Sequence, residues 1–380
     1  MKKDVLIMFG GISPEHEVSI ITGLQVIENI DLEIYTPLPI YINKNGVFKL
    51  LKHLKSRNDF KNSKQINVKF GCDENGGFIE FSEGLSNKKI YPYSAYLAFH
   101  GGNGENGAIQ GMMESFNIAY TSSSKESSTI LMNKQLTKEQ VQLAGVNVVP
   151  GLSVKALDIK ENSVSITKNI IRDLNLPLII KPVHLGSSIG IKVAKTEVEL
   201  EKFLLEASFI DSEILVEKFL TNIIEYNCSV RLVNGNLQTS EIEKPISKDE
   251  ILSFADKYQS GAKKTGGTSG MASLQRDLPA KISDDLKKQI QESAKKAFLA
   301  CRCKGMVRID FMVCENQLYL TEINSIPGSM AFYLWEASGI QFKQQITDLI
   351  EQSIIDFDSS KGQTLNYSTD IIDKFIESVS

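Results

Sequence analysis

Residues 308–329 read RIDFMVCENQLYLTEINSIPGS and give the strongest local signal for the fold. Two runs of alternating apolar and polar residues flank a polar turn, which predicts an antiparallel hairpin. With a three-residue turn at 315–317, Asp310 lies opposite Glu322 and Arg308 lies opposite Asn324, whereas a two-residue turn would place Asp310 on the other face. We therefore predict the three-residue turn, with all four polar side chains on one face.

This predicted face is suited to a metal ion. The carboxylates of Asp310 and Glu322 repel each other at close range unless a cation lies between them, and Asn324 adds an amide oxygen. Mg²⁺ prefers such oxygen ligands and keeps positions open for substrate phosphates. The alternative, which these residues alone leave open, is a solvated polar face of the hairpin.

Two segments further towards the N-terminus suit a nucleotide. Lys181 ends an apolar run and precedes HLGSSIG, a loop whose small residues leave backbone N–H groups free for phosphate oxygens. It lacks the Gly-Lys-Ser/Thr ending of a Walker A motif, and a plain hairpin turn explains it equally well. Glu217, at the end of a further strand, could accept from an adenine amine or could simply be solvated.

The N-terminal third alternates strands with helices. Apolar runs at 5–9 and 96–99 predict buried strands, and helical patterns follow at 15–30 and 108–116. This order predicts a parallel sheet with helices on its faces. Glu15 begins the first helix, where an acidic side chain also favours the helix dipole. Further helices are predicted at 127–144, 198–207, 283–300 and 341–357, and a polar linker then leads to a short apolar-spaced segment at 371–379.

The composition excludes several classes of protein. The 380 residues are 42 % hydrophobic, and 42 Lys and Arg against 46 Asp and Glu give a net charge of −4, which argues against nucleic-acid partners and anionic membrane surfaces. No apolar run reaches the roughly 20 residues that span a bilayer, and residues 5–9 are too short for a signal-peptide core. Five cysteines form no disulfide framework. We expect a reduced, cytoplasmic, multi-domain protein.

In their order along the chain, these motifs resemble the ATP-grasp superfamily and, within it, the D-alanine–D-alanine ligase family. The resemblance covers nearly the whole chain and is most specific at GGISPEHEVS, HGGNGENGAIQG, KPVHLGSSIGIKV, ADKY and RIDF…EINSIPG. It implies a three-domain α/β fold, with ATP between the central and C-terminal domains. We place the N-terminal parallel-sheet domain at 1–122, the central domain at 123–220, the C-terminal domain at 221–358 and an extra tail at 359–380.

The resemblance also implies roles for matching residues around ATP. Two magnesium ions, with Mn²⁺ as an alternative, would be held by Asp310, Glu322 and Asn324. The implied ATP-binding residues are Lys134, Lys181, Glu217, Lys218, Leu220, Glu225 and Lys257. Lys257 lies in the segment 256–270, whose glycines and few apolar residues predict a mobile surface loop that closes over the site.

The implied reaction joins two D-alanines for peptidoglycan precursors, and so serves cell-wall biogenesis and cell shape, with release of ADP. The carboxylate of the first D-alanine would attack the γ-phosphate of ATP, and the amine of the second would then attack the resulting acyl phosphate. Glu15, Ser187 and Tyr258 would bind and orient the amino acids. Arg308 and the backbone N–H of Gly328 would stabilise the tetrahedral oxyanion.

One departure from the family pattern affects the acceptor pocket. Relatives usually carry a serine five residues after the glycine of NSIPG, and this chain has Tyr333 there, with Ser329 close in sequence as a substitute. Alternatives are therefore a ligase that uses another acceptor, such as D-serine or a different amine, and a nucleotide-binding protein without catalysis. Tyr258 argues against a lactate acceptor. The oligomeric state, a homodimer included, stays open.

Overall fold

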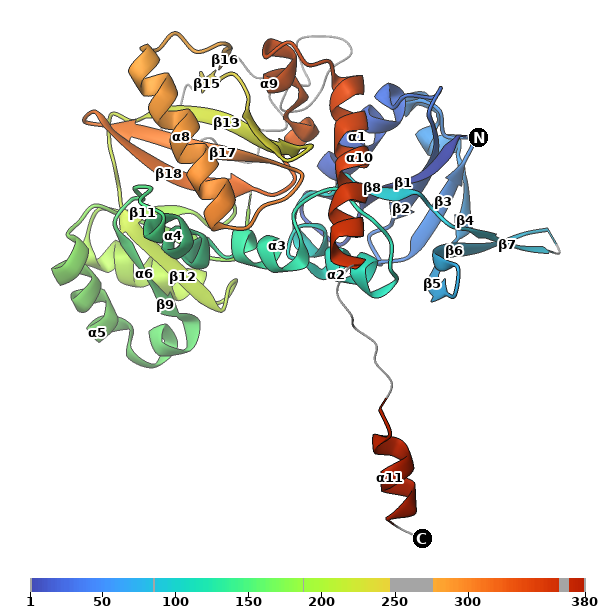
Figure 1. Cartoon of the computed structure of the whole chain (residues 1–380). Coiled ribbons are helices and arrows are strands. Elements are labelled where there is room, and N and C mark those ends of the chain that lie inside the picture. Colours follow the sequence, from blue (N-terminus) through green and yellow to red (C-terminus); the bar gives the residue numbers. More distant parts are fainter. Residues whose placement is uncertain (1, 85, 187, 247–275, 362–368, 379–380) are drawn as a thin grey trace.

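The structure is a computed structural model that describes residues 2–84, 86–186, 188–246, 276–361 and 369–378 (Figure 1). Its first unit is a five-stranded sheet in the order β4-β3-β2-β1-β8, in which β1 pairs in parallel with β2 and β8. The parallel core that the sequence predicts is confirmed. The strands are β1 (Lys3–Gly10), β2 (Tyr35–Ile42), β3 (Phe48–Lys52), β4 (Lys64–Asn67) and β8 (Ser94–Leu97).

Helices and a small second sheet complete the first unit. Helix α1 (His16–Asn29) packs against β1, and α2 (Ala108–Ser115) follows the glycine-rich loop, which contains the short helix η2 (Gly102–Gly104). Both helices begin and end within a residue of the predicted bounds. The additional elements, for which the sequence pattern gave no expectation, are η1 (Arg57–Asn62), β5 (Lys69–Asp73), β6 (Gly76–Glu83) and β7 (Ser86–Ile90).

The predicted helix at 127–144 is wrong as a single element. The structure contains two helices, α3 (Lys125–Met132) and α4 (Lys134–Leu143). Asn133 between them leaves the helical region, with ψ of 105°, and its Oδ1 accepts a hydrogen bond from the Leu136 backbone N–H at 2.9 Å. An asparagine that caps the following helix in this way satisfies an N–H group that a helix start leaves free. The break places Lys134 at the start of α4.

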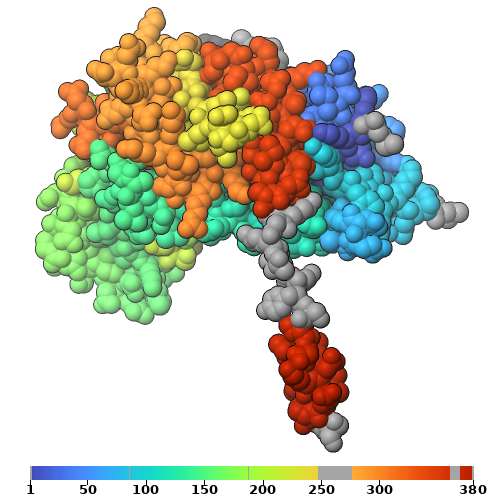
Figure 2. All heavy atoms as spheres, viewed as in Figure 1, coloured from blue at the N-terminus to red at the C-terminus, as the bar shows by residue number. Residues whose placement is uncertain are grey.

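The central unit is a four-stranded antiparallel sheet in the order β11-β10-β12-β9 with two helices packed on it. Figure 2 shows this green unit as a lobe of its own. The two strands around the Gly-Ser loop are confirmed as β10 and β11. Its elements are β9 (Gly151–Lys155), α5 (Ala156–Leu174), β10 (Leu178–Pro182), β11 (Lys192–Ala194), α6 (Glu197–Ala207) and β12 (Glu213–Lys218).

The third unit contains the hairpin that opened the sequence analysis. Its sheet has the order β14-β13-β17-β18, and helix α8 packs on it. The main elements are β13 (Ile224–Val233), β14 (Asn236–Thr239), α8 (Asp284–Ala300), β17 (Met306–Cys314) and β18 (Gln317–Asn324). A two-stranded ribbon, β15 (Lys244–Pro245) with β16 (Arg276–Asp277), lies beside β13.

The turn of this hairpin differs from the prediction. Cys314 pairs with Gln317, so the turn has two residues, Glu315 and Asn316, both with positive φ, as type I′ turns require. A β-bulge between Asp310 and Phe311 then shifts the register by one residue. Asp310 therefore still lies opposite Glu322, as predicted, although the turn length that we expected is wrong.

The end of the chain packs back onto the first unit. After η5 (Gly328–Ala331) and α9 (Phe332–Ala337), helix α10 (Phe342–Lys361) contacts α1 and β8 (Figure 1). Glu351 on α10 accepts hydrogen bonds from the hydroxyls of Tyr35 and Tyr93 at 2.7 and 2.8 Å. One buried apolar cluster therefore joins β1 and α1 with residues of α9 and α10.

Two further large clusters, and a small one at Ala331, Tyr333 and Leu334, make up the other apolar clusters of the described residues. Residues of α3 and α4 share a cluster with the third unit's sheet and α8, whereas the central unit has a cluster made only of residues within 159–216. The last described element, α11 (Ile371–Glu377), is drawn below the rest of the molecule, and Ile371, Ile372, Phe375 and Ile376 on it are exposed.

Candidate active site

A cavity of about 240 Å³ lies where the three units meet, and most of the predicted site residues line it. They come from the start of α1, the start of α4, the central sheet and the β17–β18 hairpin. The predicted residues that line this cavity are Glu15, Lys134, Lys181, Glu217, Glu225, Arg308, Asp310, Glu322, Asn324 and Gly328.

The hairpin places a charged pair on the cavity wall. The Arg308 guanidinium donates to both carboxylate oxygens of Asp310, from Nε at 2.7 Å and from the second terminal nitrogen at 2.8 Å. Asn324 Nδ2 also donates to Asp310, at 3.1 Å. Burial acts to lower the pKa of Arg308, but the carboxylate of Asp310 outweighs it and holds that pKa well above its usual range. Arg308 is therefore a permanent positive charge in the wall.

The hairpin face suits a hard cation. Asp310 and Glu322 offer carboxylate oxygens from paired positions, and Asn324 can offer its amide oxygen after a flip of the amide. Within the described residues, no cluster of three or more His, Cys, Asp or Glu could hold a metal, so the amide is needed as the third donor. The donor chemistry fits Mg²⁺ better than a soft metal such as Zn²⁺, because it contains neither thiolate nor imidazole.

A buried ion cluster borders the cavity through Lys181 and Glu217. Glu217 is 5 % exposed and pairs with Lys181 at 2.6 Å and with Lys138. Burial acts to raise the pKa of Glu217, but the two lysines hold it below its usual range. Lys138 was not predicted as a site residue, although it lies one helical turn after Lys134. Its Nζ also donates to the Val149 carbonyl at 2.6 Å, and burial lowers its pKa.

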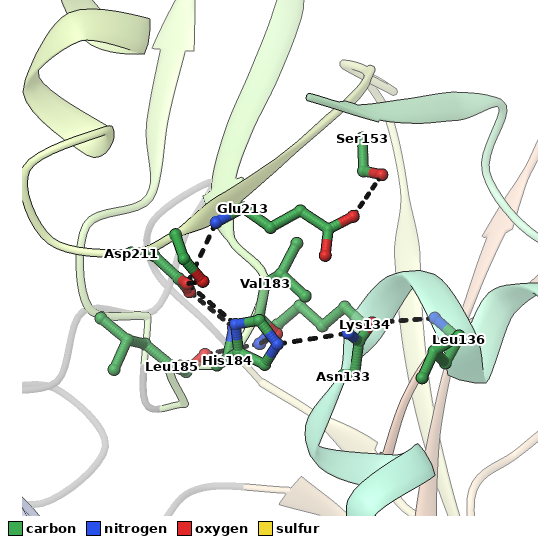
Figure 3. A network of polar contacts seen from close by, with 10 residues as sticks. Asn133, Lys134, Leu136, Ser153, Val183, His184, Leu185, Asp211 and Glu213 are labelled. Atoms are coloured by element: carbon green, nitrogen blue, oxygen red, sulfur yellow. Dashed lines mark hydrogen bonds and ion pairs between the residues drawn. The ribbon is translucent and has the colours of Figure 1, made fainter. Parts of the chain in front are cut away.

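Lys134 lies against the Gly-Ser loop that follows β10 (Figure 3). Its Nζ donates to the carbonyls of Leu185 and, at 3.4 Å, Val183. His184 in this loop pairs through Nδ1 with Asp211 at 2.8 Å, and its Nε2 lies 3.2 Å from Nδ2 of Asn133, the residue that caps α4. Burial lowers the pKa of Lys134, while the charge of Glu322 acts to raise it. The capped helix therefore fixes both the lysine and the loop.

The first unit contributes two carboxylate side chains, Glu15 and Glu105, to the cavity wall. Ser13 Oγ donates to the His100 carbonyl at 2.8 Å and accepts from the Glu15 backbone N–H at 3.0 Å. Glu105 accepts from the Gly101 N–H at 2.6 Å, and burial, followed by the charge of Glu15, raises its pKa to about 7. A Cβ on Gly101 would lie 2.7 Å from Glu15 Oε2, so only glycine allows this approach. Glu105 and His100 both line the cavity and were not predicted.

The loop after the hairpin has an unusual backbone. Ser329, Met330 and Ala331 all have φ between 46° and 53°, a conformation that non-glycine residues rarely adopt. The strained run is held by hydrogen bonds from the Met330 N–H to the Pro327 carbonyl at 2.8 Å and from Gln345 Nε2 to the Met330 carbonyl at 2.7 Å. Its first neighbour, Gly328, is the predicted oxyanion donor.

Tyr333 is buried, and its hydroxyl bonds to a residue of the cavity wall, Glu243. Its hydroxyl donates to Glu243 at 3.1 Å, and the Arg276 guanidinium lies 4.0 Å from the centre of its ring and pairs with Glu243 at 2.9 Å. Ser329 is 3 % exposed, and neither it nor Tyr333 is among the lining residues.

The remaining predicted residues lie elsewhere. Lys218 and Leu220 follow Glu217 in the chain but are not among the lining residues of the described part. Ser187, Lys257 and Tyr258, with the predicted mobile loop 256–270, lie outside the described residues. Among the described helices, none combines the length and the apolar character needed to cross a membrane.

Comparisons with known proteins agree with this architecture. The family models described as D-ala D-ala ligase N-terminus and C-terminus match residues 4–123 and 140–351. The D-alanine–D-alanine ligase of Thermosipho melanesiensis is 35 % identical over 362 residues, which cover 93 % of this chain and 94 % of that protein. The ligase of Thermosipho africanus is 34 % identical over 380 residues, with 98 % and 99 % covered.

Solved structures give the same result. The D-alanine–D-alanine ligase of Coxiella burnetii matches with a TM-score of 0.79 and 26 % identity, over 95 % of this chain and 96 % of that one. The VanG D-Ala:D-Ser ligase of Enterococcus faecalis matches with a TM-score of 0.78 and 26 % identity, over 93 % and 100 %. The chain therefore belongs to the D-alanine–D-alanine ligase family and has its ATP-grasp fold, as the sequence motifs predicted.

Proposed function

We propose that this protein is an ATP-dependent, ADP-forming ligase that joins two D-alanines for peptidoglycan precursors. The observation that carries the proposal is the single cavity that collects Glu15 from the first unit, Lys181 from the central unit, and Arg308 and Asp310 from the third. An ammonium site, cations for phosphate and an oxyanion site within one cavity are what an acyl-phosphate ligase needs.

The nucleotide would lie between the central and third units. Lys134 and Lys181 supply positive charge for phosphates, and the acidic Glu217 accepts from the adenine amine. Two Mg²⁺ ions would be held by Asp310, Glu322 and Asn324. When bound, they would neutralise phosphate charge. Phosphoryl transfer depends mainly on such positioning and charge, so the chain itself needs no nucleophile.

The amino acids would lie between the first and third units. Glu15 binds the ammonium group of the first D-alanine. The carboxylate of that D-alanine then faces the γ-phosphate. In the second step the amine of the second D-alanine attacks the acyl carbon, and Arg308 with the Gly328 N–H stabilises the oxyanion. Ser187 and Tyr258 belong to the same proposal as residues that orient the amine.

The position of Tyr333 supports D-alanine as the acceptor. Because its hydroxyl is bonded to Glu243 and its ring contacts Arg276, the Tyr333 side chain is held outside the lining of the described cavity. A small D-amino acid can then bind as in relatives that have serine there. A cytoplasmic location and a homodimer complete the proposal, and light scattering tests the dimer.

Phosphate release with D-alanine as the only amino acid tests the function, together with detection of the dipeptide. We expect both, and both should depend on ATP and Mg²⁺. Absence of phosphate release would contradict the proposal. A panel of D-serine, glycine and D-lactate as acceptors then tests selectivity. If any of them exceeds D-alanine tenfold in kcat/KM, about 1.4 kcal/mol, the acceptor assignment is wrong.

A further inference from the structure

The glycine-rich loop of the first unit holds the backbone of one residue of the third, Ile326. Glu105 Oε1 accepts from the backbone N–H of Ile326 at 3.1 Å and from Ser325 Oγ at 3.2 Å. The His100 ring also hydrogen-bonds the backbone of Ile326. Because this contact favours the protonated ring, the backbone group is the carbonyl, which accepts from a ring N–H. Both polar groups of one residue are thus held by a loop more than 200 positions away.

The loop residues are themselves fixed. His100 is 4 % exposed, and its Nε2 lies 2.7 Å from the Thr22 hydroxyl. Burial lowers the pKa of His100 to about 4, so the ring is neutral near pH 7 and has a single N–H. That N–H, on Nδ1, serves the Ile326 carbonyl, and Thr22 donates to Nε2. Glu105 Oε2 is held by the Gly101 N–H at 2.6 Å.

Little freedom remains between Ile326 and Gly328. Proline at 327 fixes its own φ, here at −68°, and restricts the residue before it to extended conformations. The Ile326 side chain is 2 % exposed within the cluster that the first unit shares with α10. The Pro327 carbonyl, which belongs to the same peptide unit as the Gly328 N–H, accepts from the Met330 N–H at 2.8 Å. Together, this bond and the held backbone of Ile326 determine where the N–H of Gly328 points.

We propose that His100 and Glu105 are positioning residues that hold the Ile326 peptide so that the Gly328 N–H faces the developing oxyanion. The proposal rests on the proposed function. It also links the two amino-acid sites, because the His100 carbonyl accepts from Ser13, which in turn holds the Glu15 backbone. The loop 100–105 thus sets the ammonium site and the oxyanion donor together.

The two chemical steps separate this role from a structural one. The oxyanion forms in the second step, when the amine attacks, so phosphorylation of the first D-alanine should be spared. A rapid-quench measurement of the first turnover, in the full-length enzyme with ATP, Mg²⁺ and D-alanine, reports phosphorylation as ADP without attack on the acyl carbon. For Glu105→Gln we expect steady-state dipeptide formation to fall about 100-fold, ADP formation in the first turnover to stay within about threefold, and the KM for ATP to be unchanged.

Paired histidine variants sharpen the test. The amide nitrogen of His100→Asn lies near the Nδ1 position and that of His100→Gln near Nε2, so only asparagine can keep the bond to Ile326. We expect His100→Asn to form dipeptide at least tenfold faster than His100→Gln. Glu114→Gln, at a carboxylate that pairs with Lys125 and Tyr120 at the surface, is the matched control.

Each outcome has one meaning. If the parent enzyme releases no phosphate with D-alanine, the proposed function fails. If the parent is active and Glu105→Gln loses first-turnover ADP formation and dipeptide formation equally, or neither, the positioning role is wrong while the function stands. Equal rates for the two histidine variants would likewise overturn the positioning role.

Discussion

His100 and Glu105 predict pH effects on stability that cancel in the parent protein. Burial lowers the pKa of His100 from 6.5 to about 4, and burial with the charge of Glu15 raises the pKa of Glu105 from 4.5 to about 7. Each change is about 2.5 units, because 6.5 − 4 and 7 − 4.5 are both 2.5. At about 1.4 kcal/mol per unit, each group contributes on the order of 3 kcal/mol.

The two contributions have opposite signs. Between pH 6.5 and 4 the unfolded chain protonates His100 and the folded chain does not, so stability falls as the pH falls. Between pH 7 and 4.5 the folded chain protonates Glu105 and the unfolded chain does not, so stability rises as the pH falls. The windows overlap from pH 4.5 to 6.5, where the two contributions cancel.

Removal of one group exposes the other. Relative to the parent, Glu105→Gln should lose about 3 kcal/mol of unfolding free energy as the pH falls from 7 to 4.5, because it lacks the contribution of Glu105. Relative to the parent, His100→Asn should lose a similar amount, about 3 kcal/mol, as the pH rises from 4 to 6.5. Urea titrations without substrate measure this, followed by the fluorescence of Trp335, the only tryptophan, which is 1 % exposed.

Exposed positions provide the controls. Glu74→Gln and His53→Asn remove the same chemical groups at the surface and should parallel the parent at every pH. His53 has a φ of 65°, which asparagine tolerates. If Glu105→Gln also parallels the parent from pH 4 to 7, the burial argument for Glu105 is refuted, and a parallel His100→Asn refutes the one for His100.

Three further predictions concern the metal site, the ion cluster and the hairpin turn. Glu322→Gln should reduce dipeptide formation at least about 100-fold at saturating Mg²⁺ with an unchanged melting temperature, and activity within a few-fold of the parent would refute the metal assignment. Lys138→Met should lower the free energy of unfolding, measured with urea, by about 3 kcal/mol, because Glu217 keeps only Lys181 as a partner. The double variant with Glu217→Gln should recover most of that loss, and additive losses in the double variant would contradict this. Asn316→Val should lower the free energy of unfolding by about 1–2 kcal/mol, whereas Asn316→Gly should leave it unchanged. Equal values for the two variants would contradict a type I′ turn.

Local patterns predicted the fold well because they depend on neighbours in sequence. The hairpin pairs Asp310 with Glu322 as expected, but alternation alone could not locate the bulge that compensates for the shorter turn. The break at Asn133 was missed because the apolar spacing continues across it. Periodicity describes which face is buried, and it does not report where a single side chain caps a helix.

The sequence predicted the site residues that match the family motifs, but it did not predict the contacts between distant segments. Glu105 lies within the HGGNGENG loop that the sequence analysis quoted, yet its partner Ile326 is 221 residues away. The pairing of Lys138 with Glu217 spans 79 residues. Contacts of this kind arise when separate units pack together, and no local pattern in either segment encodes the distance between them.

The separate interior of the central unit has a consequence for substrate entry. Its buried cluster contains only residues within 159–216, whereas the first unit shares a continuous interior with α10. A hinge movement of the central unit exposes no shared apolar core, but parting the first unit from α10 would expose one. We expect such a hinge to open the nucleotide side of the cavity while the contact between the first unit and α10 stays closed. Binding of ATP, which contacts the central unit in the proposed function, should then be coupled to movement of that unit.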